Sequence, residues 1–514
     1  MGTLFFCTWP LVITPHCSTA SHEGSTSNQP LVQGAQMNGG SDIPMTRVRT
    51  EEPSTIRSRR TLTAPAEEEP RRSFSLARTA TVLFTPMKPV GKAPGVLKSI
   101  RSILTASWLN LLLVFIPISW AFNFADKEQH TLIFVFSFLA IIPLAKLLAF
   151  ATDELSLRVG QTLAGLLNAT LGNAVELIVA ILALTKCQLT VVQSSLIGSI
   201  LSNLLLVLGM CFFAGGIKFS EQGFGASATQ LNSSLLTISV IAVLLPAAFR
   251  FTVTAQSDPD PGQDILKLSR GTAIIMLFIY ASYLVFQLFS HTELYDDQSH
   301  DVIKSTKYKK HKKGEEQVDT PTTATDLENS EEPKEEEEEP QLSLYMTIGL
   351  LVVVTVFVAI TAEWLVDSID GLTDTGHISK EFVGVILLPI VGNAAEHVTA
   401  VSVSVKDKLT LSLGVAVGSS IQIALFVIPF IVTLAWWLGK PLTMLFDPYE
   451  SIAVFLAVLT VNYATQDGKS NWLEGMILMC LYLILAVTFW YYRGARAPPF
   501  VPQYLEREPF LVLD

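Results

Sequence analysis

Long apolar runs, separated by short polar stretches, make up most of the chain between residues 107 and 492. Each run is near the ~20 residues that a helix needs to cross the hydrocarbon core of a bilayer. The pattern therefore predicts an all-α, polytopic membrane protein of about eleven transmembrane helices. We expect these helices at residues 107–124, 130–150, 160–185, 189–214, 229–250, 270–290, 342–366, 381–405, 409–437, 447–464 and 472–492.

A short motif occurs twice within these runs. It reads Gly-Asn-Ala-Val-Glu at 172–176 and Gly-Asn-Ala-Ala-Glu at 392–396, an offset of 220 positions (396 − 176). The same offset pairs Gly198-Ser199 with Gly418-Ser419 without a gap. Five crossings, an odd number, separate the two copies, so the halves run through the membrane in opposite directions. The sequence thus predicts one helix followed by two inverted five-helix repeats, a build whose binding site lies near the membrane midplane.

Polar regions lie outside the predicted helices. Residues 1–100 are rich in Ser, Thr, Pro, Gly and Arg and cannot bury enough apolar surface to fold alone, so we expect a disordered tail. The loop between the halves is basic at 308–313 and acidic at 315–339, which suits either a soluble spacer or a surface that collects cations. The predicted organisation is a tail (1–100), a first transmembrane helix (101–127), a first repeat (128–290), the basic and acidic loop (291–341), a second repeat (342–495) and a C-terminal tail (496–514).

Lysine and arginine set the expected orientation. Basic residues precede the first helix at Lys98 and Arg101 and follow the sixth at 304–313. Six helices between them place both clusters on one side, and the positive-inside rule assigns that side to the cytosol. The N-terminal tail and the loop are therefore expected in the cytosol, and the C-terminus on the other side. Arg493 and Arg496, which lie near the C-terminus, mildly disagree with this orientation.

Composition narrows the class further. Half of the 514 residues are hydrophobic and the mean hydropathy is +0.43, which is too apolar for a soluble protein of this length. The net charge of −11 comes largely from the acidic loop, and no basic surplus points to nucleic acid. Five cysteines without paired spacing predict free thiols. No basic residues precede the first apolar stretch, so we expect no signal peptide.

Each copy of the motif places a carboxylate several residues inside an apolar helix. A charged side chain at that depth costs about 2.5–3.5 kcal/mol, and such residues usually face a transport pathway. Asn173 precedes Glu176 by three positions and Asn393 precedes Glu396 by three, so each amide shares a helix face with its glutamate. Pro389 and the glycines of the motif loosen the helix and free backbone carbonyls as further ligands.

The following helix in each half adds more oxygen donors. They are Ser199, Ser202 and Asn203 in the first half and Ser419, Ser420 and Gln422 in the second. Carboxylates, amides, hydroxyls and carbonyls together form an all-oxygen set, which hard cations such as Ca²⁺ prefer. Mn²⁺ also accepts oxygen ligands, so the set does not decide between the two metals. His397 stands alone and offers no soft-metal site.

Two glutamates that face one cavity predict ion exchange. Without a bound ion such a site is doubly negative in a low dielectric, and one divalent cation or two protons neutralise it. Metal and protons then compete for Glu176 and Glu396, and we expect the two ligands to exchange. The alternative, that these glutamates only hold helices together, leaves the symmetric pair unexplained.

At these residues the chain resembles the Ca²⁺/H⁺ (cation/proton) exchanger family, specifically its fungal vacuolar type. The resemblance covers roughly residues 95–495 and rests on both motifs, the two Gly-Ser pairs and the acidic loop. It implies an antiporter rather than an enzyme, which loads the vacuolar lumen with Ca²⁺ at the expense of the proton gradient and needs no cofactor besides the transported ions. It implies that Glu176 and Glu396 carry cation and protons by turns. The further site residues that it implies are Asn173, Asn393, Ser199, Ser419 and Gln422.

Several alternatives stay open at this point. The resemblance links His397 to proton coupling or metal preference, against a packed histidine with no such role. A cation channel lined by the same glutamates and a sodium-coupled calcium exchanger are the competing functions, and the oligomeric state is open. Acidic residues near helix ends are either ligands along an access path or interfacial anchors: Asp153, Glu154, Glu363, Asp367, Asp447 and Glu450.

Overall fold

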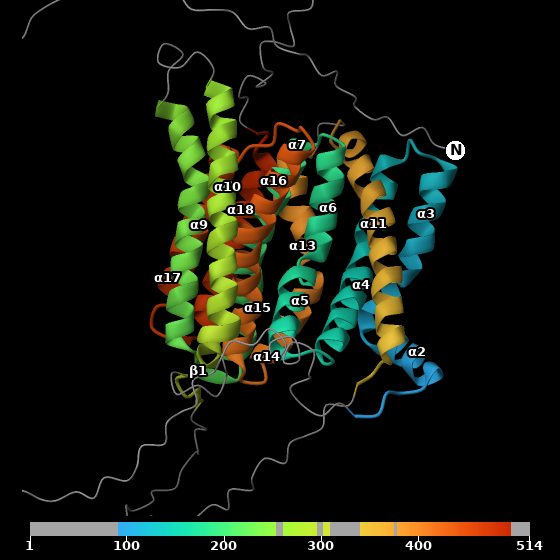
Figure 1. Cartoon of the computed structure of the whole chain (residues 1–514), viewed down its shortest axis with the longest axis vertical. Helices are drawn as coiled ribbons and strands as arrows, with labels where there is room; N and C mark the ends of the chain where they lie inside the picture. The colour runs from blue at the N-terminus through green and yellow to red at the C-terminus, as the bar shows by residue number, and fades with distance from the viewer. Residues whose placement is uncertain (1–90, 253–260, 296–301, 309–339, 375–377, 495–514) are drawn as a thin grey trace, which may run out of the picture. The chain divides into compact units, whose positions relative to one another are not determined.

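The chain forms a bundle of helices in a computed structural model that describes residues 91–252, 261–295, 302–308, 340–374 and 378–494 (Figure 1). These residues all belong to one compact unit, Ser73–Asp514. The first half contributes α2 (Val96–Thr105), η1 (Trp108–Val114), α3 (Phe115–Ala125), α4 (His130–Ser156), α5 (Gln161–Leu171), α6 (Ala174–Thr185), α7 (Leu189–Leu201), η2 (Ser202–Val207), α8 (Leu208–Gly216), α9 (Ala226–Thr252), α10 (Pro261–Val285), η3 (Phe286–Ser290) and η4 (Thr292–Tyr295). The second contributes α11 (Leu344–Asp374), α12 (Lys380–Phe382), η5 (Val383–Leu387), α13 (Leu388–Gly392), α14 (Ala394–Ser404), α15 (Leu409–Gln422), η6 (Ile423–Val427), α16 (Ile428–Trp437), α17 (Pro448–Ala464) and α18 (Trp472–Tyr491).

Eight helices in the described part of the chain are long and apolar enough to cross a bilayer, or nine if the bent segment Lys380–Ser404 is one span. The all-α polytopic fold is therefore confirmed, while the count of eleven spans stays a prediction. The expected helix at 160–185 is divided at Gly172 and Asn173 into two short helices of 11 and 12 residues. The expected helix at 447–464 is present as α17, which has 17 residues.

Both copies of the motif interrupt a helix. Asn173 has φ −101° and ψ 27°, and Asn393 has φ −85° and ψ 2°, a sparsely populated region of backbone conformation. The axis bends by 57° at the second break. Pro389 has no N–H to donate, and the preceding turn widens to a π-helix, η5. Each glutamate then lies in the first turn of a new helix, α6 or α14, where the positive end of the helix dipole stabilises a carboxylate.

Local geometry repeats with the motif. The two non-glycine residues with positive φ among those described are Cys187 (58°) and Asp407 (66°), which are also 220 positions apart (407 − 187). Each lies in the turn between the motif helix and the next helix. The π-helical turns η2 and η6 likewise occupy matching places, directly after α7 and α15. The structural similarity of the halves therefore extends beyond the motif to the helices that follow it.

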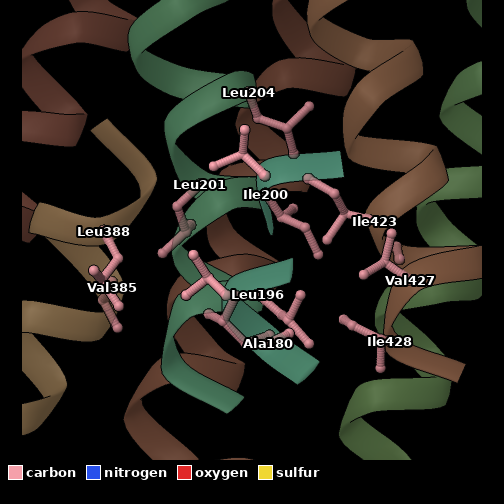
Figure 2. Close-up of a cluster of buried hydrophobic side chains, with 14 of the residues drawn as sticks. Ala180, Leu196, Ile200, Leu201, Leu204, Val385, Leu388, Ile423, Val427 and Ile428 are labelled. Carbon is pink, nitrogen blue, oxygen red and sulfur yellow. The ribbon is translucent and has the colours of Figure 1, made fainter. Parts of the chain in front are cut away.

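Helices α7 and α15 form the centre of the bundle. In the spans that contain them, 83% and 78% of the most apolar stretch of 18 residues is buried inside the protein. The corresponding share is 22% in the span that begins at Gly262. Figure 2 shows Leu201 on the side of Val385 and Leu388, and Ile200 on the side of Ile423. Close approach requires Gly198, because a Cβ there would lie 2.6 Å from the Pro389 ring. The helices that follow the two motifs are thus packed against the opposite half.

Three short strands form a sheet at one end of the bundle. Strand β1 (Phe219–Gly223) pairs antiparallel with β2 (Thr306–Lys307) and with β3 (Lys469–Ser470). The sequence did not predict these strands, which join part of the polar loop to both halves. We call this end the sheet face; Figure 1 shows β1 and α2 there, with the labels of α6 and α7 toward the other end, the opposite face.

The described part of the chain begins earlier than the predicted first helix. Helix α2 starts at Val96, inside the region expected to be a disordered tail, and its apolar side chains Leu97 and Leu104 point away from the protein. An apolar surface outside the bundle, next to Lys98 and Arg101, is typical of a helix in the membrane interface. Residues 1–90, residues 309–339 with nearly all of the basic and acidic segments of the loop, and the C-terminal tail lie outside the described residues. Of the five cysteines, Cys187, Cys211 and Cys480 are described and are free.

Candidate ion-binding site

A network of side chains connects the two halves at the first motif. Asn173 Nδ2 donates to Gln422 Oε1 at 2.6 Å, and Ser419 Oγ donates to Asn173 Oδ1 at 2.8 Å. Asn203 Nδ2, from η2, in turn donates to Ser419 Oγ at 3.1 Å. Asn173, Asn203 and Ser419 are buried. The amide of one motif is therefore held by the helix that follows the other motif.

Glu176 lines a small cavity together with Ser199. The cavity volume is about 20 Å³, which is enough for about one water molecule. Its other walls are largely apolar, and Glu176 itself is 9% exposed. The apolar lining residues are Ile141, Val175, Val179, Leu196, Leu365, Leu388 and Val391. The remaining polar lining residue is Ser195, so Glu176 lies in a small and largely apolar cavity.

Glu396 lines a second and larger cavity, of about 400 Å³, together with Ser419 and Gln422. The cavity is also lined by residues at the sheet-face ends of α4, α5 and α15 and by η4, among them Asp153, Asn168, Thr410 and Tyr295. It therefore leads from Glu396 toward the sheet face. The two cavities share symmetry-related polar residues. Glu176 and Ser199 line the small cavity, and their counterparts Glu396 and Ser419 line the large one.

The two glutamates are neighbours across Gly392. This glycine lines both cavities, and a Cβ built on it would lie 2.6 Å from Glu176 Oε1. Glu396 follows Gly392 by four residues, about one helical turn. The structure thus brings together two carboxylates from different halves.

Polar atoms without a protein partner gather around the second motif. Among the described residues, Asn393 Oδ1 and Nδ2, Asn203 Oδ1 and Glu396 Oε2 are buried and accept or donate no hydrogen bond. Asn393 is 0% exposed, whereas its counterpart Asn173 is fully engaged with Ser419 and Gln422. Orphaned buried oxygens are costly unless something else satisfies them. Three of these four atoms are oxygens, the ligand type of a hard cation.

Two further predicted residues, His397 and Ser420, line neither cavity. His397 Nε2 is 3.4 Å from Ser202 Oγ in η2, so it also joins the halves, beside the site rather than in either cavity. Ser420 donates to the Ala416 carbonyl in its own helix and lines neither cavity. In the described part of the chain, no three His, Cys, Asp or Glu side chains come together as a metal site. A cation here would need amide, hydroxyl or backbone oxygens beside the two carboxylates.

The acidic residues near helix ends have separate environments. Asp153 lines the large cavity, but Glu154 accepts hydrogen bonds from the backbone N–H groups of Gln341 and Leu342, at 3.1 Å each. Glu154 therefore anchors the start of the second half to α4. At the opposite face, Glu363 and Asp367 form ion pairs with Lys186. Asp447 caps α17, and Glu450 is buried beside α7.

Sequence reasoning missed a charged residue that contacts the wall of the large cavity. Lys146 lies within the apolar run of α4, and its Nζ donates to Thr399 Oγ1 at 3.0 Å. Thr399 lines the large cavity one turn beyond Glu396. The signal was visible, because a lysine in the middle of an apolar helix seldom faces lipid. Asn232 was missed in the same way: it is buried in α9 and lines the same cavity.

Comparisons with known proteins agree with one another. Residues 129–289 and 346–491 match the model of the sodium/calcium exchanger protein family. The chain is 51% identical over 483 residues to a vacuolar calcium ion transporter of Cryptococcus neoformans, covering 82% of this chain and 79% of the relative. It is 41% identical over 382 residues to a Ca²⁺/H⁺ antiporter of Synechocystis, covering 74% and 96%.

Solved structures show the same fold. The structure of native YfkE aligns with a TM-score of 0.58 and 30% sequence identity, over 75% of this chain and all of that one. The crystal structure of the H⁺/Ca²⁺ exchanger CAX aligns with a TM-score of 0.52 over 77% of this chain and 90% of that one. At 13% identity the second likeness concerns the fold alone.

Proposed function

The chain belongs to the sodium/calcium exchanger protein family, and on this premise we propose that it is a secondary active antiporter that exchanges cytosolic Ca²⁺ for lumenal protons across the vacuolar membrane. The names of its relatives support this choice: a fungal vacuolar calcium ion transporter and a Ca²⁺/H⁺ antiporter. The same names support a multi-pass protein of the vacuolar membrane. Transport, not a chemical reaction, is the activity.

One observation carries the proposal: two carboxylates from opposite halves, Glu176 and Glu396, are neighbours across Gly392 inside the bundle. Each is a carboxylate that no lysine or arginine pairs with among the ion pairs of the described residues. Two unpaired negative charges in a low dielectric must be neutralised, by one divalent cation or by two protons. Moving two unneutralised carboxylates from one side of the membrane to the other costs too much free energy. The site therefore changes sides only with Ca²⁺ or protons bound, and exchange is obligatory.

The cation would reach the pair from the sheet face through the large cavity. Asp153 on its wall attracts cations, and Ser419 and Gln422 place further oxygens near Glu396. On the lumenal side, protons would reach Glu176 through the small cavity that it lines together with Ser195 and Ser199. The sheet face carries the exposed Lys304 and Lys307, which favours the cytosol for that face.

Two alternatives keep specific support. The matching family is described as a sodium/calcium exchanger, so a Na⁺ gradient is the competing driving force. Mn²⁺ accepts the same oxygen ligands and is the competing cargo. A channel lined by the glutamates is less well supported, because the cavity beside Glu176 is largely apolar and has room for about one water molecule.

The test is uptake of radioactive Ca²⁺ into sealed vesicles that contain the chain, driven in turn by a pH step and by a Na⁺ gradient. We expect uptake with the pH step only, with Mn²⁺ added in excess as a measure of competition. Glu176→Gln and Glu396→Gln should each reduce uptake to the vesicle background, since either leaves the site one charge short. Glu128→Gln, an exposed carboxylate outside the bundle, is the matched control. Normal uptake by either site variant would refute the assigned roles.

A further inference from the structure

Another buried carboxylate, Glu450, lies outside both cavities. Glu450 is in the first turn of α17 and is only 1% exposed, less than Glu176 at 9%. Helix α17 begins at the opposite face and packs along α7. Glu450 is therefore buried on the side of the protein where the lumen is expected, and the exchange site described above does not use it.

One hydrogen bond holds Glu450, and its second oxygen has none. Ser194 Oγ, from α7, donates to Glu450 Oε1, while Oε2 is buried without a partner. None of the ion pairs formed by the described residues involves Glu450. A buried carboxylate with one donor and no counter-charge is satisfied when a proton occupies the free oxygen.

Among the described residues, two acidic groups act on Glu450. They are Asp447, three residues earlier on the same helix, and Glu381 on α12. Asp447 has its own donors, the backbone N–H of Tyr449 and the hydroxyl of Tyr492, at 2.8 and 2.9 Å, and these stabilise its charge. Helix α7 contributes only Ser194 to Glu450. Both of these neighbours are acidic, and no three His, Cys, Asp or Glu side chains gather as a metal site among the described residues.

Helix α7 connects this carboxylate to the exchange site. Ser194 binds Glu450, and the next residue, Ser195, lines the small cavity together with Glu176 and Ser199. Ser194 and Ser199 are five residues apart, about 7.5 Å along the helix axis. Glu450 and the small cavity that Glu176 lines therefore contact consecutive residues of α7, Ser194 and Ser195, and that cavity can hold about one water molecule.

We propose that Glu450 is a second proton-binding site of this protein, which receives protons from the lumenal side and supplies them to the cavity of Glu176. This inference rests on the proposed Ca²⁺/H⁺ exchange and adds a residue to its lumenal half. In each cycle a proton binds Oε2, forming an O–H bond while Ser194 continues to donate to Oε1, and then leaves toward the cavity as Oε2 returns to the carboxylate form.

The experiment is radioactive Ca²⁺ uptake into vacuolar vesicles at a fixed external pH and a series of lumenal pH values. Wild-type uptake should rise as the lumen is acidified. In Glu450→Gln, which keeps the Ser194 hydrogen bond and the shape of the side chain, uptake at the most acidic lumen should fall severalfold and become insensitive to lumenal pH. The external Ca²⁺ concentration for half-maximal uptake should stay unchanged, and Glu450→Asp should restore part of the pH dependence. Glu221→Gln, an exposed carboxylate at the sheet face, is the matched control.

The outcomes distinguish a failure of the Glu450 proton site from a failure of Ca²⁺/H⁺ exchange. A wild-type lumenal pH profile in Glu450→Gln overturns the proton site. Absence of pH-driven uptake in the wild-type protein overturns the exchange function instead. If Glu450→Gln does not fold, Ser194→Ala is measured in its place: a shifted lumenal pH profile supports the proposal, and an unchanged one rejects it.

Discussion

The contact between Gly392 and Glu176 provides the sharpest test of the paired-carboxylate site. A Cβ at position 392 would lie 2.6 Å from Glu176 Oε1, where ordinary contact begins at 3.4 Å. In Gly392→Ala the carboxylate must therefore move by 0.8 Å (3.4 − 2.6). The fold should tolerate this, because the displaced atoms are the end of a flexible side chain.

The displacement is large for a cation site. Calcium–oxygen distances span only about 2.3–2.6 Å, so a ligand moved by 0.8 Å leaves that range unless its neighbours follow. Misplacement of this size typically costs on the order of 10²-fold in well-oriented sites. We expect Gly392→Ala to raise the KM for Ca²⁺ by about 10- to 100-fold, or about 1.4–2.8 kcal/mol.

The assay is initial Ca²⁺ uptake as a function of external Ca²⁺, together with the thermal stability of the purified protein. Gly418→Ala is the matched control, because that glycine precedes Ser419 in the second half and a Cβ there meets nothing within 4 Å. It should leave KM close to the wild-type value. An unchanged KM in Gly392→Ala would show that the Glu176 carboxylate, in its position beside Gly392, is not a ligand of the cation.

Two further substitutions test the surroundings of the site. Ser419→Ala removes the donor to Asn173 Oδ1 and leaves a buried amide oxygen without its partner, at a cost of about 1–3 kcal/mol. We expect this variant to have a higher KM for Ca²⁺ and a lower Tm, and an unchanged KM would contradict the hydrogen-bond network. Lys146→Met removes a positive charge from the neighbourhood of Asp153 and Thr399. Its KM for Ca²⁺ should fall severalfold at low ionic strength and less at high salt, whereas a higher KM would mean that Lys146 positions α14 instead.

Local pattern was enough to predict the class of fold and the place of the motifs. Apolar runs of bilayer length predict the helices, and a carboxylate inside such a run is too costly to be incidental. The offset of 220 positions related the two halves, and the structure adds matching turns at Cys187 and Asp407. Membership of the exchanger family, inferred from the motifs, is confirmed by the family match and the relatives.

The helix interruptions were only partly predictable. Pro389 and the glycines indicated weak points, because proline lacks a donor and glycine lacks a stabilising side chain. They did not show that the predicted helix at 160–185 divides into two short helices while the one at 381–405 bends by 57°. The short strands at the sheet face were missed, since pairs of residues such as Thr306–Lys307 are too short to show a strand pattern.

The residues that carry charge and oxygen inside the membrane were predictable from the sequence, because burial cost and periodicity are properties of neighbours along the chain. Their different surroundings follow from the packing of the helices: Asn173 is held by Ser419 and Gln422, the side chain of Asn393 has no partner, and Glu154 anchors a backbone segment. These differences depend on contacts between helices more than 180 positions apart, which no local pattern encodes. The motif has nearly the same residues in both halves, but helix packing gives its two copies different hydrogen-bond partners.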